Sequence, residues 1–186
     1  RFLRCCKLLD MGIADGGASV AYLLQHCTRD FADSSGQALS GSINGELGDL
    51  PPQVDTSHTI SRRTSVSAAV FHGVKPGEDP LLTTMWTMLG EPSFTIAIPC
   101  WVGAGTVGAE AIGDKTSPLC DAARELRDAA YVKVDSVSGN DDSEKDLEVL
   151  ETSGLPSIWA KTLPMERANL KLVSDALAKW RSDKFD

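Results

Sequence analysis

The sequence predicts an α+β fold in which an antiparallel meander of strands, over about residues 64–102, is flanked by helices. Three short stretches in this range are rich in apolar and β-branched residues and are separated by tight turns. Links this short favour antiparallel pairing, because a parallel pair needs a crossover of about a dozen residues. On both sides of the meander, apolar residues recur at helical spacing. At 186 residues the chain can bury a sizeable core, so we expect one domain, residues 1–186.

Two helices are expected before the meander, over residues 1–10 and from about 18 to 31. The apolar side of the second consists of Val20, Leu23, Leu24, Cys27 and Phe31. Its polar side carries Gln25, Arg29 and Asp30. Residues 33–57 are mostly Ser, Gly, Asn, Asp and Pro, which predicts a long irregular connection of the kind that is often functional.

The three strands of the meander are expected at Thr64–His72, Leu81–Leu89 and Phe94–Val102. The segments GVKPGEDP and GEPS between them have strong turn chemistry. The first and third strands carry apolar residues on both faces, so we expect the sheet to be covered on each side.

Helices are expected again after the meander, at Ser117–Tyr131 and from about Pro164 onward. The apolar stripe of the last helix consists of Leu170, Val173, Ala176, Leu177 and Trp180. Between these helices, Asp141–Glu151 holds six acidic residues against one Lys. This run is interpreted as a solvated helix face, with an acidic docking site as the alternative.

The composition narrows the function classes. A net charge of -8 and a pI of about 4.9 argue against nucleic acid or an anionic membrane as the main partner. No apolar run approaches the length of a membrane span, so no membrane insertion is expected. The five cysteines are odd in number and lack C-x-x-C spacing, which argues against a disulfide scaffold or a zinc ribbon. No residue pattern implies a metal or an organic cofactor.

Two motifs have an ordinary structural explanation. Gly103–Gly108 matches G-x-G-x-x-G after a predicted strand, but Gly113 and Pro118 leave no room for the helix that a dinucleotide site needs. We therefore expect a flexible exit from the strand. Cys5, Cys6 and Cys27 occupy apolar helical positions and Cys100 follows Pro99 in a strand, so all four are expected to be buried. A thiol enzyme that uses Cys100 remains an alternative.

The pair Arg62–Arg63 directly precedes the first strand of the meander. Such a pair is either a solvated strand start or a group directed at a ligand, because the guanidinium fork suits a carboxylate or a developing oxyanion. His58 and His72 flank the pair, and each is a conceivable general base or a simple polar or capping residue.

Residues 60–102, ISRRTSVSAAVFHGVKPGEDPLLTTMWTMLGEPSFTIAIPCWV, resemble part of a known family. They are similar to the C-terminal half of N-terminal-nucleophile (Ntn) hydrolases related to acyl-coenzyme A:6-aminopenicillanate acyltransferase, the linear amide C-N hydrolases. An Ile-polar-Arg element before a strand is found in that family, and VKPGEDPLLTTMW followed by LGEP is typical of one bacterial branch. The helix from Tyr22 to Asp30 and the Trp180–Arg181 end look similar as well.

The resemblance implies a four-layer αββα fold and a catalytic Cys at the mature N-terminus. That Cys attacks a linear amide, and the resulting acyl-enzyme passes its acyl group to water or an amine. Arg62 would be the family's active-site Arg, in an orienting or oxyanion role, and Arg63 is a weaker candidate for a catalytic role. The expected partner is a small-molecule amide or acyl substrate, and relatives are commonly exported, to the periplasm or outside the cell.

The family's nucleophile begins a Cys-Thr-Thr run, which this sequence lacks, so no nucleophile is expected in this chain. We expect the chain to be the C-terminal portion of a larger Ntn-hydrolase-like domain, inactive without the missing N-terminal segment of the same protein. This hypothesis predicts exposed apolar surface where the missing strands would lie. The alternative is a non-catalytic binding or structural domain that retains the scaffold.

Overall fold

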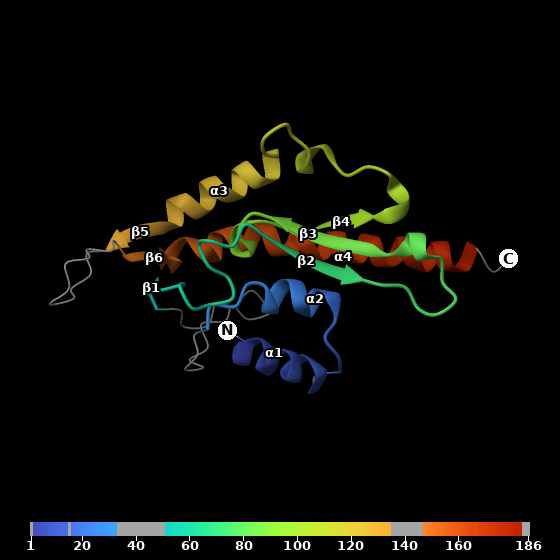
Figure 1. The fold of residues 1–186 in the computed structure, drawn as a ribbon, viewed down its shortest axis with the longest axis horizontal. Coiled ribbons are helices and arrows are strands. Elements are labelled where there is room, and N and C mark those ends of the chain that lie inside the picture. The colour runs from blue at the N-terminus through green and yellow to red at the C-terminus, as the bar shows by residue number, and fades with distance from the viewer. Residues whose placement is uncertain (1, 15, 33–50, 135–146, 184–186) are drawn as a thin grey trace.

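The computed structural model describes residues 2–14, 16–32, 51–134 and 147–183 and has an α+β fold (Figure 1). Two small antiparallel sheets lie end to end along the long axis, with helices beside them. The strand orders are β2-β3-β4 and β1-β6-β5. The mixed α and β class expected from the sequence is therefore confirmed.

The predicted meander is the first sheet, formed by β2 (Ser67–His72), β3 (Thr84–Leu89) and β4 (Ile98–Trp101). Its register places Phe71 opposite Met85, and Met85 opposite Cys100. The strands are shorter than predicted because 3-10 turns occupy Pro80–Leu82 and Pro92–Phe94. Each of these turns starts at a proline, whose fixed φ suits a helical first turn and whose missing N–H cannot serve a strand ladder.

The second sheet was not predicted. It pairs β6 (Leu147–Glu151) with β1 (Gln53–Val54) on one side and with β5 (Tyr131–Val134) on the other. The expected irregular connection at 33–57 thus ends in a short strand, and residues 33–50 lie outside the described part. The expected helix over the acidic run is wrong for 147–151, because ladder pairing on both sides and the buried side chains of Val149 and Leu150 outweigh local charge. Residues 141–146 of that run are not described.

Four helices frame the sheets: α1 (Phe2–Ala14), α2 (Val20–Tyr22, continued by a π-helix at Leu23–Cys27), α3 (Pro118–Ala130) and α4 (Leu155–Asp183). The predicted helices before and after the meander are confirmed, with two corrections. The second helix is a short α-helix continued by a π-helix, and it ends at Cys27 rather than near Phe31. The last helix begins nine residues before Pro164, which lies inside it. Within the described residues, no helix combines the length and the apolar character needed to cross a membrane.

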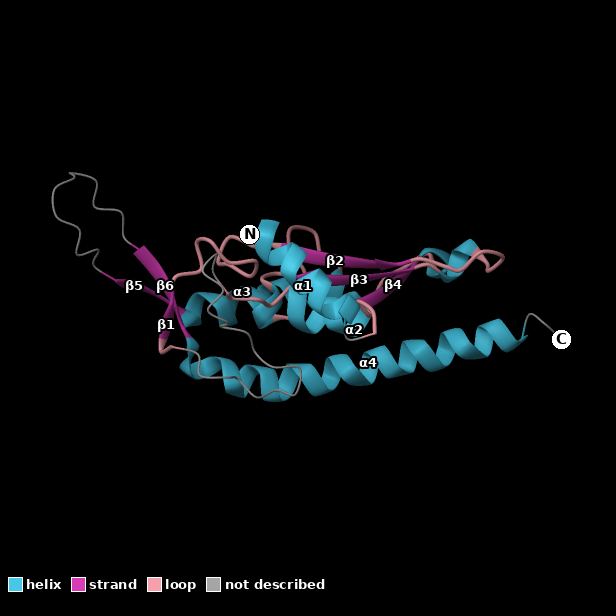
Figure 2. Ribbon diagram, turned by 90° about the horizontal axis from the view of Figure 1, so that it is seen from below, coloured by secondary structure: helices cyan, strands magenta, loops and turns pink. Residues whose placement is uncertain are grey.

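The core consists of two clusters of buried apolar side chains. The first lies beside the second sheet and includes Phe31, Phe94, Leu150 and Trp159. The second lies between the meander sheet and α4 and includes Leu24, Trp86, Met88, Val173 and Leu177. Figure 2 shows α4 running along this side of the sheet, and Figure 1 shows α2 beside β2.

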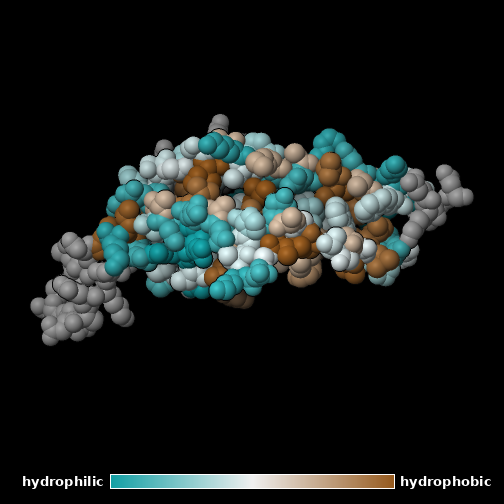
Figure 3. All heavy atoms as spheres, turned by 90° about the horizontal axis from the view of Figure 1, so that it is seen from above, coloured by the Kyte–Doolittle hydropathy of each residue, from teal (hydrophilic) through white to brown (hydrophobic). Residues whose placement is uncertain are grey.

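None of the described helices lies over the other face of the meander sheet (Figure 2). Phe71 projects from this face and is 71% exposed, and its neighbour Met85 is half-buried. The expectation that the sheet is covered on both sides is therefore wrong for the described residues, whereas exposed apolar surface on the sheet was predicted and is present. Viewed from the side of α3, exposed apolar side chains form several separate patches among hydrophilic ones (Figure 3).

Candidate functional site

The Arg62–Arg63 pair lines a pocket of about 300 Å³. Its walls come from the chain after β1, from the segment that leads into β2, and from β6; the lining residues are Asp55, Thr56, Ser57, Arg62, Arg63, Thr64 and Glu148. The segment is anchored at Ser61, which is buried and whose N–H donates to Asp30 O over 3.0 Å. A turn closed by Ser65 N–H and Arg62 O, 2.8 Å apart, then leads to β2. The two arginines therefore stand on a fixed backbone at one pocket wall.

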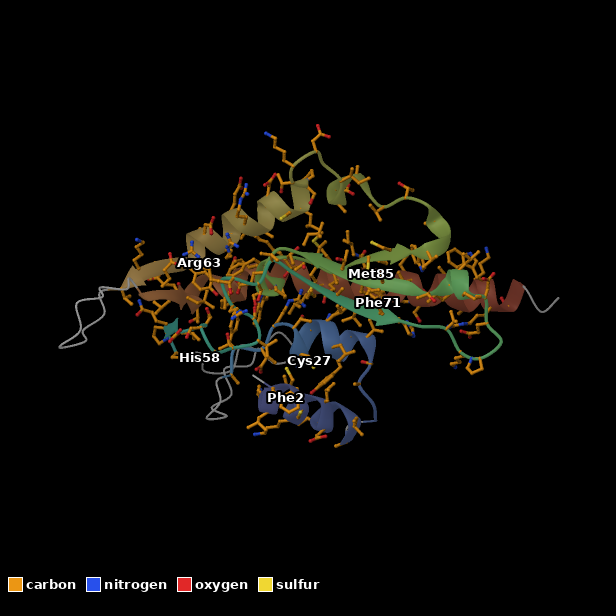
Figure 4. The ribbon with its side chains drawn as sticks, viewed as in Figure 1. Phe2, Cys27, His58, Arg63, Phe71 and Met85 are labelled. Atoms are coloured by element: carbon orange, nitrogen blue, oxygen red, sulfur yellow. The ribbon has the colours of Figure 1, made fainter. Side chains whose placement is uncertain are left out.

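The guanidinium of Arg63 is engaged by protein groups. It forms an ion pair with Glu148, lies 3.6 Å from Asp128 Oδ1, and sits over the ring of Tyr131 at 5.7 Å from the ring centroid. Arg127 donates to the backbone oxygen of Arg63 over 3.4 Å. These contacts join the segment before β2 to α3, β5 and β6. Arg63 therefore has a structural role, because it holds these elements together. Figure 4 shows Arg63 where these elements meet.

The side chain of Arg62 is different. It is half-buried on the same wall, and within the described residues no carboxylate pairs with its guanidinium. A guanidinium has five N–H donors and remains charged at any physiological pH. The pocket thus presents one positive group whose donors are not taken up by the described protein groups. Such a group suits a carboxylate or an oxyanion of a bound molecule.

A buried polar cluster, which we name the Glu91 cluster, lies behind the pocket and consists of Thr56, Ser61, Glu91, Ser93 and Tyr131. Tyr131 Oη and Ser61 Oγ donate to Glu91 Oε1 over 3.1 and 3.2 Å. Thr56 Oγ1 lies 3.1 Å from Tyr131 Oη, and Ser93 Oγ lies 2.9 Å from Ser61 Oγ. Thr56 also lines the pocket, so hydrogen bonds connect the pocket wall to the buried carboxyl group.

Glu91 is 1% exposed, and its Oε2 has no hydrogen-bond partner among the described residues. Burial raises the pKa of Glu91 to about 7, an effect that its hydrogen bonds with Tyr131 and Ser61 only partly offset. Burial and the neighbouring Glu91 raise the pKa of Tyr131, which keeps this phenol protonated as a donor. A carboxyl group that titrates near neutral pH can hold or release a proton there. The sequence predicts a turn at residues 90–93, and Glu91 lies in it between Gly90 and Pro92. The available signal was an acidic residue on so short a link from β3 to β4.

The two histidines that flank the arginines in sequence do not join them in space. His58 is exposed on the loop after β1 and is absent from the pocket lining (Figure 4). His72 is exposed at the far end of β2 and lines a different pocket. Neither position supports a general base acting beside Arg62.

The cysteines give no sign of an activated thiol. Cys100 is buried as expected, and burial raises the pKa of its thiol, which disfavours the thiolate that attacks substrates. Burial also raises the pKa of Cys27 to about 11. The expectation of burial is wrong for Cys5, which is exposed, and only partly right for Cys6 and Cys27. The reason is that α1 packs with one narrow stripe, Arg4, Leu8 and Gly12, and Cys5 lies beside it.

The glycine-rich segment at 103–108 is exposed. The 3-10 turn Val102–Ala104 includes its first two residues, the 3-10 turn Ala109–Ala111 follows it, and no described α-helix begins on its glycines. It follows an antiparallel strand, so it lacks the setting of a dinucleotide site. In the described part of the chain, no group of three or more His, Cys, Asp or Glu side chains is arranged to hold a metal ion.

Comparisons with known proteins give no further guide to function. No family model, no curated protein and no solved structure matches this chain.

Proposed function

We propose that this chain is the C-terminal part of a cysteine Ntn-type amidohydrolase or acyltransferase that acts on a linear amide through an acyl-enzyme. The single observation that carries the proposal is the Arg62 guanidinium on the pocket wall with no carboxylate partner among the described residues. Arg62 stands at the position that the family resemblance assigns to the active-site Arg. The nucleophilic Cys is contributed by a segment outside this chain.

The contrast between the two arginines supports a role for Arg62 rather than Arg63. Glu148 and Asp128 offset the charge of Arg63, and Tyr131 covers one side of its guanidinium. Among the described residues Arg62 has no such compensation, and its side chain is half-buried in the pocket wall. A charge in that setting attracts an anionic group more strongly than a fully hydrated one does. A substrate carboxylate and the oxyanion formed during amide attack are both suitable partners.

In the proposed reaction the Cys thiolate attacks the amide carbonyl carbon, and negative charge collects on the carbonyl oxygen. The C–N bond then breaks, the amine leaves with a proton, and the acyl group remains on sulfur as a thioester. Water or an acceptor amine takes the acyl group and returns the thiol. Arg62 would stabilise the oxyanion or orient the substrate, which are the two roles that the resemblance implies for it.

The uncovered face of the meander sheet supports the same proposal. Phe71 and Met85 lie side by side on this face, and β2 is an edge strand. An exposed edge with apolar side chains is a surface on which further strands can pair or pack. The four-layer arrangement of an Ntn hydrolase would place its second sheet there.

The second candidate is a non-catalytic binding domain. Two observations favour it. Burial raises the pKa of the Cys27 and Cys100 thiols, and neither His58 nor His72 lines the Arg62 pocket. In that case Arg62 would hold the carboxylate of a ligand without chemistry.

The test uses the native full-length polypeptide with two matched series of probes. N-Acylglycines and the corresponding N-acylglycinamides, with acyl groups from acetyl to octanoyl and phenylacetyl, report hydrolysis as released amine. The enzyme proposal expects turnover that iodoacetamide abolishes. Preference for N-acylglycine over its amide would show that Arg62 binds a substrate carboxylate. Binding without turnover would support the second candidate, and neither binding nor turnover would contradict both.

A further inference from the structure

Glu91 and Glu166 are both buried glutamates, but their partners differ. Glu166 is bonded as a carboxylate, because Arg29 donates to both of its oxygens. Glu91 accepts only from the hydroxyl groups of Tyr131 and Ser61, both at Oε1, and its Oε2 has no partner among the described residues. A buried ionised carboxylate needs a counter-charge, whereas the neutral acid leaves only one O–H unpaired, which costs far less. The surroundings of Glu91 therefore suit the protonated form.

The cations that face Glu91 are bonded elsewhere. Arg63, from the segment before β2, and Arg127, from α3, attract its ionised form. Both guanidinium groups pair with Asp128 instead, at 3.6 and 2.9 Å. The phenol of Tyr131, on β5, also faces Glu91 and donates to it. Burial outweighs these attractions and raises the pKa of Glu91, in agreement with the pattern of its hydrogen bonds.

Two members of the Glu91 cluster connect it to the pocket lined by Arg62. Ser61 donates to Glu91 and directly precedes Arg62 in the chain. Thr56 forms part of the pocket wall and lies 3.1 Å from the hydroxyl oxygen of Tyr131, which donates to Glu91. A charge on Glu91 would thus lie behind the wall, in an interior that screens charges weakly.

The lining of this pocket is sensitive to such a charge. Asp55 and Glu148 line it together with Arg62 and Arg63, so two negative side chains accompany two positive ones. The attraction for an anion therefore comes at close range, from the guanidinium of Arg62. A further negative charge on Glu91 would oppose a bound anion, whereas the neutral acid would not.

From these contacts we propose that Glu91 is a positioning residue for the Arg62 pocket, which binds an anion while Glu91 holds its proton. The inference rests on the proposed function for the anion at Arg62, and it adds proton-linked control of that binding. Because linkage is reciprocal, a bound anion retains the proton on Glu91, and loss of the proton weakens the binding of the anion. The affinity for a carboxylate falls as the pH rises through about 7, where Glu91 titrates.

The experiment measures the binding of hexanoate, a carboxylate without an amide bond, to the full-length protein. Hexanoate and Arg62 both stay charged from pH 6 to 8, so neither contributes a pH dependence. Calorimetry in two buffers of different ionisation enthalpy gives the affinity and the protons taken up. The parent should bind at least about fivefold more weakly at pH 8 than at pH 6 and should take up protons at pH 7.5. Glu91→Gln, which is neutral at every pH, should bind equally at both pH values, close to the parent at pH 6, with most of the proton uptake lost.

His58→Gln is the matched control, since histidine side chains titrate in this range and His58 lies on the exposed loop after β1. It should keep the pH dependence of the parent. If Glu91→Gln does not fold, the carbon-13 carboxyl signals of the parent serve instead: one glutamate should titrate near neutral pH, and hexanoate should raise its midpoint.

The outcomes separate this inference from the proposed function. Binding that Arg62→Ala weakens but that is independent of pH, without proton uptake, would overturn the role of Glu91 and leave the proposed function standing. No binding of hexanoate, or equal binding in Arg62→Ala, would contradict the anion at Arg62 and overturn both.

Discussion

Arg29 and Glu166 form a buried bidentate ion pair across 137 residues of sequence, with N–O distances of 3.0 and 2.8 Å. Every donor of Arg29 is used, because its guanidinium also donates to the backbone oxygens of Leu24, Pro92 and Thr95. Glu166 Oε2 accepts the N–H of Ala97 as well. The pair therefore fixes the end of the π-helix and the approach to β4 against the middle of α4.

Removing the carboxylate from this pair should destabilise the fold strongly. Glu166→Gln leaves the charge of Arg29 buried and without a counter-ion, which costs about 3–5 kcal/mol in free energy of unfolding. Urea unfolding measures this loss. Asp175→Asn is the matched control, since it breaks the exposed pair with Lys171 and should cost less than about 1 kcal/mol. Similar losses in the two variants would contradict the structural role of Arg29.

The raised pKa of Glu91 predicts a pH-dependent stability. The folded state holds the proton up to about pH 7, whereas an ordinary glutamate releases it near pH 4.5. The stability linked to this proton is therefore fully present below pH 4.5 and is lost as the pH rises through 7. A shift of this size corresponds to about 3 kcal/mol.

Urea unfolding of the parent and of Glu91→Gln from pH 4 to 8 isolates this effect, because subtracting the two curves removes the other titrating groups. Relative to the variant, the parent should become less stable as the pH rises from 4.5 to 7. A difference that is constant over this range would show that Glu91 titrates normally.

Gly90 is expected to be sensitive to a single methyl group. Its φ is +99°, and an added Cβ would lie 2.6 Å from Ala123 Cβ on α3. Gly90→Ala should therefore cost roughly 2–4 kcal/mol, from backbone strain and from overlap. Gly77, with φ +87° and open space around it, isolates the backbone part, so Gly77→Ala should cost about 1–2 kcal/mol. Equal losses of stability in the two variants, measured by thermal unfolding, would show that Ala123 of α3 does not pack against Gly90.

The thiols should differ in reactivity. Cys5 is exposed and should react first with a disulfide reagent at pH 8, whereas buried Cys100 and the high-pKa thiol of Cys27 should react slowly. Timed labelling with peptide mapping gives the order. Fast labelling of Cys100, or loss of a measured activity in Cys100→Ala, would favour the thiol enzyme that uses Cys100.

Replacing Arg62 should impair turnover by the full-length protein without unfolding it. Arg62→Ala should lower kcat by at least about tenfold, roughly 1.4 kcal/mol of barrier, since the oxyanion or the substrate loses its guanidinium. Arg124→Ala removes an exposed arginine of α3 that pairs with Asp121, and its kcat should stay unchanged. An unaltered kcat in Arg62→Ala would exclude a catalytic role for this residue. If only KM rises, Arg62 binds the substrate carboxylate.

Local pattern sufficed for the meander and most of the flanking helices, because strand alternation, turn residues and the helical spacing of apolar residues all act within a few residues. Local pattern failed where segments far apart in the sequence determine the secondary structure or the burial of a residue. The acidic 147–151 segment becomes a strand only because β1 and β5 pair with it on both sides. Arg29 and Asp30 were placed on a polar helix side, but the π-helix at Leu23–Cys27 changes the angular spacing and the helix ends before them. Both residues are buried in ion pairs with Glu166 and Arg4.

The candidate site was predictable only in part. Arg62 and Arg63 were identified from their position before a strand, but nothing local distinguishes them. The difference arises from Glu148 on β6 and Asp128 on α3, which reach Arg63 and not Arg62. Glu91 depends in the same way on Tyr131 and Ser61, which approach it from β5 and from the segment before β2.

The most direct test of the proposed function is the intact mass of the full-length protein during turnover of N-octanoylglycine, with denaturation by acid. The account predicts a population heavier by one octanoyl group, located on a cysteine outside this chain, and cleared by hydroxylamine. It also predicts that this population forms more slowly in Arg62→Ala. Turnover with no acylated cysteine, or an acyl group on Cys100, would contradict the account.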